Sequence, residues 1–176
     1  MIILETDRLY LRNAKETDAA EMYDYRNNPL CAKYQRGQTK DMDGIKALIE
    51  DHGSDALSAE RPCLLAVESK DTGETVGEIV VMPNAETFSL GYTFSYKHHR
   101  KGYAFESLSA LTDLLHARYP KWEFICCTDK ANIASRALLE KLGYRDLGYL
   151  ESKDSQVYGK WITGETEAEI AGIVKK

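Results

Sequence analysis

Hydrophobic positions along the chain follow two periods, and the period of two predicts the strands. It is clearest where Phe88, Leu90, Tyr92 and Phe94 alternate with small and polar residues. A continuous apolar run follows Trp122 and is typical of a strand buried on both faces. Together these patterns predict about seven strands, at residues 8–12, 63–68, 75–82, 87–96, 122–128, 144–151 and 156–162.

Apolar residues three and four positions apart predict four helices between these strands. The first helix opens with Asp18 and Glu21, which resemble a capping box, and Gly143 follows the last one as a C-terminal cap. Pro120 ends the third helix. The predicted helices cover residues 18–26, 41–51, 104–119 and 132–142.

The order of these elements predicts one mixed α/β domain over residues 1–162. An early strand and two helices precede an antiparallel meander, which is followed by helix, strand, helix and two closing strands. The sheet should therefore be mostly antiparallel. Residues 163–176 form a polar tail with a weak helical pattern, for which disorder is the alternative.

Composition and charge narrow the possible functions. The chain has 176 residues, 43% hydrophobic and 29% charged, with a net charge of -5, which argues against nucleic acid as the main partner. No apolar run reaches the roughly 20 residues that span a bilayer, and the N-terminus lacks the basic region of a signal peptide. The four cysteines have neither disulfide-framework nor zinc-site spacing. We therefore expect a cytoplasmic protein without a metal site or membrane contact, either a monomer or a homodimer.

The sequence KHHRKGYAFESL, at residues 97–108, has the features of an anion site. A basic run meets Gly102 and the small Ala104 where an amphipathic helix begins. Unpaired N–H groups and the helix dipole favour negative charge at such a point, and glycine permits close approach. Lys97, Arg100 and Lys101 add positive charge, although they can also form an ordinary solvated turn.

Two helix starts, HHRKGYA and NIASRALLEKLGY, each following a strand, resemble the GNAT superfamily of acyl-CoA-dependent N-acetyltransferases. With the opening ETDRLYLR, the chain is most similar to the ribosomal-protein N-terminal acetyltransferase (RimJ/RimL-like) branch, over residues 3–162. The resemblance implies a GNAT-like fold with a splayed strand pair that admits acetyl-CoA.

The resemblance also implies which residues contact the cofactor. The family's pyrophosphate motif, Q/R-x-x-G-x-G/A, falls on residues 99–104: His99, Arg100, Lys101, Gly102, Tyr103 and Ala104. His99 departs from the usual Gln or Arg. Backbone groups of Phe94, Ser95 and Tyr96 should line the strand gap, where an N–H would stabilise the oxyanion.

The second motif implies the catalytic acid. Asn132 matches the residue that bonds the cofactor arm, and Ser135 matches a serine proposed to protonate the leaving thiolate. The tyrosine that many relatives carry seven residues after the asparagine is replaced by Leu139. Both polar residues also suit the first turn of a helix, with Asn132 as its N-cap.

Glu78, in the middle of the strand VGEIVVM, is the carboxylate best placed to accept the amine's proton through a water. Its alternative role is that of a solvent-facing strand residue. Tyr92, Phe94 and Tyr96 suit the core or a cleft wall better than chemistry, and Cys126 and Cys127 suit a buried strand.

Three functions are compatible with these residues. The first is direct transfer of an acetyl group from acetyl-CoA to a primary amine in a ternary complex. The second is a non-catalytic acyl-CoA-binding sensor or regulatory module. The third, a nucleotide-binding protein, lacks a G-x-x-x-x-G-K-[ST] loop. The resemblance implies a protein N-terminus as the acceptor. A polyamine, an aminoglycoside or an amino acid is the alternative acceptor. The acidic balance favours a cationic acceptor.

Overall fold

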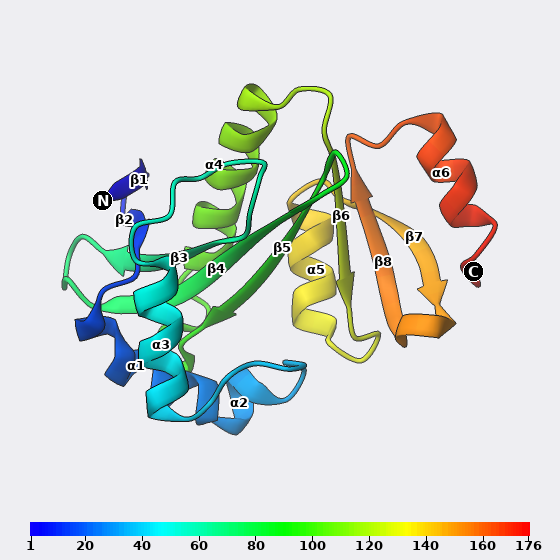
Figure 1. The fold of residues 1–176 in the computed structure, drawn as a ribbon. Helices are drawn as coiled ribbons and strands as arrows, with labels where there is room; N and C mark the ends of the chain where they lie inside the picture. Colours follow the sequence, from blue (N-terminus) through cyan, green and yellow to red (C-terminus); the bar gives the residue numbers. More distant parts are fainter.

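The computed structural model describes all residues, 1–176, and contains one eight-stranded sheet (Figure 1). The strand order is β1-β2-β3-β4-β5-β6-β8-β7, and every neighbouring pair is antiparallel except β5 with β6. The strands are β1 (Ile2–Glu5), β2 (Leu9–Asn13), β3 (Cys63–Ser69), β4 (Thr75–Asn84), β5 (Thr87–Phe94), β6 (Glu123–Thr128), β7 (Arg145–Leu150) and β8 (Ser155–Lys160).

Helices cover both faces of this sheet (Figure 1). They are α1 (Ala19–Asn27), α2 (Pro29–Ala32), α3 (Met42–His52), α4 (Tyr103–Arg118), α5 (Ile133–Lys141) and α6 (Gly164–Ala171), with 3-10 turns η1 (Glu16–Asp18), η2 (Tyr96–His98) and η3 (Glu151–Lys153). No helix is long and apolar enough to cross a membrane.

Two hydrophobic clusters fix which helices lie on which face. The larger cluster, of 20 buried residues, joins α4 and α5 to one face of the sheet. The smaller, of 8, joins α1 and α3 to the other. Strand β3 shows the alternation directly, because Leu65 belongs to the larger cluster while Leu64 and Ala66 belong to the smaller. We call these the α4/α5 face and the α1/α3 face.

The sequence prediction of a mixed, mostly antiparallel sheet is confirmed, but the sheet has eight strands rather than seven. Strand β1 has only four residues and exposed ends, so its alternation is too short to detect. The segment predicted as one strand to Tyr96 ends at Phe94 and turns into η2.

The C-terminal segment forms α6 rather than a disordered tail. The side chain of Thr163 caps it, accepting a hydrogen bond from the Thr166 N–H. Backbone hydrogen bonds in both directions between Tyr149 and Lys175 then attach the end of the chain to β7.

The sheet opens between its two parallel strands, and this gap positions the site. Only two register pairs join β5 and β6: Thr87 with Glu123, and Phe88 with Phe124. Beyond Phe88 the strands part, so the second half of β5 has no strand partner on that side. The Ser95 N–H points the other way, to the Val76 carbonyl, so Tyr92 and Phe94 direct their backbone groups into the gap.

Candidate active site

A cleft of about 600 Å³ lies at this gap and has walls from both faces of the sheet. On the α1/α3 face it is lined by Val80, Met82, Gly91 and Leu48. Its other wall includes Tyr92, Cys126, Asn132, Ser135 and Leu139, from β5, β6 and α5. The cleft therefore crosses the sheet where the two parallel strands part.

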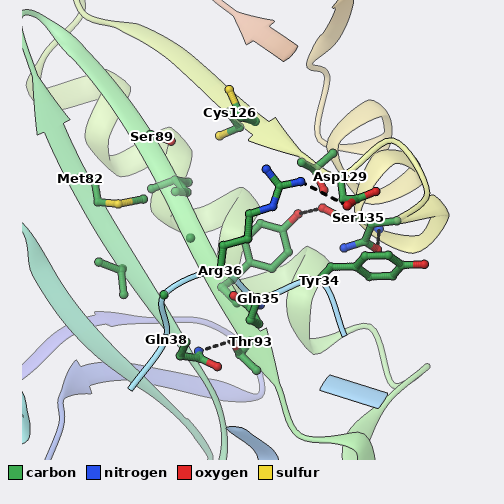
Figure 2. A pocket seen from close by; sticks show the side chains of 18 of the residues that line it. Tyr34, Gln35, Arg36, Gln38, Met82, Ser89, Thr93, Cys126, Asp129 and Ser135 are labelled. Atoms are coloured by element: carbon green, nitrogen blue, oxygen red, sulfur yellow. Dashed lines mark hydrogen bonds and ion pairs between the residues drawn. The ribbon is translucent and has the colours of Figure 1, made fainter. Parts of the chain in front are cut away.

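Tyr92 and Ser135 form a hydroxyl pair inside the cleft. Their oxygens are 2.8 Å apart, and either can donate the hydrogen bond (Figure 2). Burial raises the pKa of Tyr92, although the bond to Ser135 opposes this, so the phenol stays protonated. The sequence assigned Tyr92 to a wall and did not predict the pairing, because the two residues are 43 positions apart.

Asn132 caps α5 and so fixes the position of Ser135. Its Oδ1 accepts the backbone N–H of Ser135 at 3.2 Å, the geometry expected of an N-cap. The amide nitrogen of the same side chain is left as a donor on the cleft wall.

Gly102 lies at the other predicted helix start, just before α4. Its φ of 80° is left-handed, a conformation that suits glycine better than any other residue. The first N–H groups of α4 have no partner within the helix, as at any helix start. Arg100 also has a left-handed φ, of 64°, so the chain turns sharply on both sides of Lys101.

Arg8 supports this turn, a role that no motif in the sequence predicts. Its Nη1 donates to the Lys101 carbonyl at 2.9 Å, and its Nε lies 2.6 Å from Glu106. The guanidinium also lies over the Tyr103 ring, 4.8 Å from its centre. Because Arg8 and Lys101 are 93 positions apart, only the folded sheet brings them together.

The basic residues of this stretch are not all directed to one place. Lys97, expected among the phosphate contacts, instead lies 2.9 Å from Asp24 and 3.2 Å from Glu21, both on α1. Lys101 Nζ lies 3.2 Å from His98 Nδ1. Burial lowers the pKa of His98, and the charge of Lys101 lowers it further. The positive charge at the turn that no carboxylate pairs with therefore comes from Arg100 and Lys101, whereas Arg8 pairs with Glu106.

His99 turns toward the strand gap. Its Nε2 lies 3.0 Å from the Phe94 carbonyl, which also accepts from Cys31 Sγ at 3.3 Å. Gln35 donates to the carbonyl of Tyr92 at 3.0 Å. Side chains thus satisfy the carbonyls that the parted strands leave without partners.

Comparison with known proteins shows which family the chain belongs to. The family model described as the acetyltransferase (GNAT) domain matches residues 8–145. The chain belongs to the GNAT acetyltransferase family. It is therefore an acetyl-CoA-dependent N-acetyltransferase, as the two motifs indicated.

Individual GNAT relatives agree with the family match. The uncharacterized N-acetyltransferase YoaA of Bacillus subtilis is 28% identical over 152 residues, covering 84% of this chain and 85% of YoaA. A GNAT-family acetyltransferase from Bacillus anthracis shares the fold, with a TM-score of 0.76 and 20% identity over 90% of this chain and 96% of that one. RimL, a ribosomal L7/L12 α-N-protein acetyltransferase solved with coenzyme A, has a TM-score of 0.74 and 15% identity over 91% and 97%.

In this GNAT domain, Glu78 is not the solvent-facing strand residue that the sequence analysis gave as its alternative role. Its side chain is 3% exposed, and it forms an ion pair with Arg26 at 2.8 Å. Tyr25 and Gln38 also donate to its carboxylate, at 2.8 and 3.1 Å. Helix α1 and the residues after α2 enclose this stretch of β4, so both oxygens of Glu78 already accept hydrogen bonds.

Residues 34–39, which we call the crossing segment, lie over the cleft of this GNAT domain. The Tyr34 hydroxyl donates to the Ala131 carbonyl at 3.0 Å, and Gln38 donates to Thr93 at 3.0 Å. Arg36 reaches Asp129, which follows β6, at 3.3 Å (Figure 2). The segment therefore bonds to both sides of the strand gap. The sequence prediction placed no element here.

Cys126 and Cys127 are both on β6 and line the cleft. Cys126 is buried as predicted, whereas Cys127 is exposed. Burial raises the pKa of the Cys126 thiol, and partial desolvation of the sulfur raises that of Cys127 even though the residue is exposed, so both thiols stay mostly protonated and weakly nucleophilic.

Proposed function

We propose that the protein transfers the acetyl group to a primary amine by direct attack while both substrates are bound. The observation that carries this proposal is the single cleft crossing the sheet. It gives an acceptor a place on the α1/α3 face and brings it to the Tyr92–Ser135 pair on the other face. Direct attack needs only this proximity and no covalent enzyme intermediate.

The residues present fit acetyl-CoA at the α4 end of the gap. The turn before α4 combines outward N–H groups with Arg100 and Lys101, and Arg8 supports it through the Lys101 carbonyl, an arrangement that suits a pyrophosphate. We assign residues 99–104 to the pyrophosphate and Asn132 to the cofactor arm, as the sequence motifs predicted. When bound, acetyl-CoA supplies an acetyl thioester activated for attack.

Ser135 is the proposed acid. Its Oγ–H donates a proton to the leaving thiolate, while the Tyr92 hydroxyl, 2.8 Å away, keeps its own proton and stabilises the serine oxygen by a hydrogen bond. The proton that the amine loses then restores the Ser135 hydroxyl. The N–H of Phe94 points into the gap and can stabilise the oxyanion. The amine must lose a proton before attack. An α-amino group, with a pKa of about 7.7–8.0, does so more readily than a lysine, at about 10.4.

Glu78 stays the proposed acceptor of that proton only through an intermediary such as water, because its oxygens are already engaged. A protein N-terminus is the proposed acceptor class by similarity to RimL. The four free cysteines favour the cytoplasm as the location.

The second candidate function is an acyl-CoA sensor without turnover. It is favoured by His99 at the family's Gln/Arg position, and by side chains that already bond the Tyr92 and Phe94 carbonyls. Calorimetry with acetyl-CoA, followed by acetylation of a broad amine panel, separates the two functions. Binding with turnover supports the transferase, whereas binding without turnover of any amine supports the sensor.

Substitution of Ser135 tests the mechanism. Ser135→Ala should lower kcat about 100-fold because it removes the proton donor, with little change in the dissociation constant of acetyl-CoA. Tyr92→Phe should produce a smaller loss in kcat. Ser89→Ala, in the same cleft but on the other face, is the matched control. Equal kcat values in Ser135→Ala and the control would exclude Ser135 as the acid.

A further inference from the structure

The acceptor side of the cleft has an apolar floor. Val80 and Met82 of β4 lie opposite Gly91 and Ser89 of β5, and Leu48 of α3 adds a third apolar side chain. Met82 is 38% exposed and lines the cleft, so its apolar side chain is accessible there. If a Cβ were added at Gly91, the only atom near it would be Met82 Cε, at 3.5 Å. The floor therefore has apolar surface and room for a side group.

The charged residues of the cleft neutralise each other in pairs. Of the residues that line it, only Arg26, Arg36, Glu78 and Asp129 carry a formal charge. Arg26 pairs with Glu78 at 2.8 Å, and Arg36 pairs with Asp129 at 3.3 Å. The lining thus has two positive and two negative groups and no charge left over.

Further hydrogen bonds occupy the same groups. Glu78 accepts from Tyr25 and Gln38 as well as from Arg26. The other oxygen of Asp129 accepts the Ala131 N–H at 2.8 Å. Arg26 and Arg36 donate in addition to backbone carbonyls. Glu78 and Arg26 are buried, and their hydrogen bonds leave neither free for a second charged group. Arg36 and Asp129, with side chains 52% and 28% exposed, pair with each other, so the cleft lining carries no excess charge of either sign.

From this pairing we infer that the acceptor is a monoamine whose body is uncharged and apolar next to the amine; the inference rests on the proposed function. A polyamine or aminoglycoside would bring further ammonium groups into a cleft that has no unpaired carboxylate. A free amino acid would bring a carboxylate into a cleft that has no unpaired cation. Burying an unpaired charge is strongly unfavourable, so both classes should bind poorly. The net negative charge of the whole chain, which favoured a cationic acceptor, is not found among the residues that line the cleft.

Matched amines test the inference. Pentylamine should be acetylated with a kcat/KM at least about tenfold above that of 1,5-diaminopentane, and leucinamide at least about tenfold above leucine. A peptide with uncharged residues after its N-terminus, compared with pentylamine and leucinamide, distinguishes a protein acceptor from a small molecule. Equal or greater kcat/KM for the diamine or the free amino acid would overturn the inference while leaving the transferase in place. Failure of every amine would instead contradict the proposed function.

A variant of the floor gives an independent measurement. Ser89→Asp places an unpaired carboxylate opposite Met82, and should shift the kcat/KM ratio toward 1,5-diaminopentane by about tenfold. Ser89→Asn has the same shape without the charge and should keep the original ratio. If both variants keep the original ratio, an unpaired charge in the cleft does not determine acceptor choice and the inference fails.

Discussion

Gly102 is the residue on which the turn before α4 depends most directly. Alanine at its φ of 80° is strained by about 1–2 kcal/mol, and the added Cβ would lie 3.3 Å from Arg8 Nη2. Gly102→Ala should therefore raise the acetyl-CoA dissociation constant about tenfold, as measured by calorimetry, and lower the Tm by a few degrees.

Gly73 offers a matched control for this change. Its φ of 70° is equally left-handed, but nothing lies within 4 Å of the missing Cβ. Gly73→Ala should lower the Tm similarly and leave acetyl-CoA affinity unchanged. The same affinity in both variants would contradict a role for Gly102 in cofactor binding.

Asp18, also at the residue scale, makes stability depend on pH. Burial alone would raise its pKa, but hydrogen bonds from Arg12, Thr75 and the Lys15 backbone outweigh this and lower it. A lowered carboxyl pKa contributes stability that is present above the usual value of about 3.9 and is lost as the pH falls through the folded-state value. The free energy of unfolding should thus fall below about pH 4.

Replacing Asp18 tests this assignment by chemical denaturation across pH. Asp18→Asn removes the more buried of the two carboxylates that pair with Arg12, which keeps Glu68 at 2.6 Å, and should cost about 2 kcal/mol at pH 7. It should also flatten the decline below about pH 4. The exposed Asp71→Asn is the control and should change the free energy by no more than about 0.5 kcal/mol. If the free energy of unfolding of Asp18→Asn falls below about pH 4 as steeply as that of the wild type, other carboxylates cause the fall.

At the scale of elements, α5 depends on Asn132 for its start, and two substitutions separate the cap from cofactor contact. Asn132→Ala removes both and should lower stability by about 1 kcal/mol, along with acetyl-CoA affinity. Asn132→Asp keeps an oxygen that caps the helix but removes the amide donor. It should keep wild-type stability and still lose acetyl-CoA affinity. Wild-type affinity in Asn132→Asp would limit the residue to capping.

The sequence predicted long elements well and long-range contacts poorly. Strand β5 and helix α4 have apolar residues at regular spacing, so their positions follow from local chemistry. The family resemblance, rather than periodicity, predicted the strand gap. The Tyr92–Ser135 bond and the crossing segment depend on contacts between distant positions, which no local pattern specifies.

At the scale of the whole molecule, the cofactor site joins elements from both halves of the sheet. A ligand bound only by the folded chain stabilises it by about 2.7 kcal/mol at 100 times its dissociation constant. For a chain of this length that corresponds to about 5–10 °C in Tm. We expect acetyl-CoA to produce this shift in a thermal melt and ATP to produce none. An equal shift with ATP would favour nucleotide binding.

The gap between β5 and β6 should also determine how fast individual backbone amides exchange with deuterium. The amides of Tyr92 and Phe94 belong to a central strand but have no partner in β6. In the free protein they should exchange with deuterium as fast as loop amides, while the oppositely directed Ser95 amide, bonded to Val76, should exchange slowly. Acetyl-CoA should slow the exchange at Tyr92 and Phe94 selectively. These two amides would then report occupancy of the gap without any measurement of catalysis.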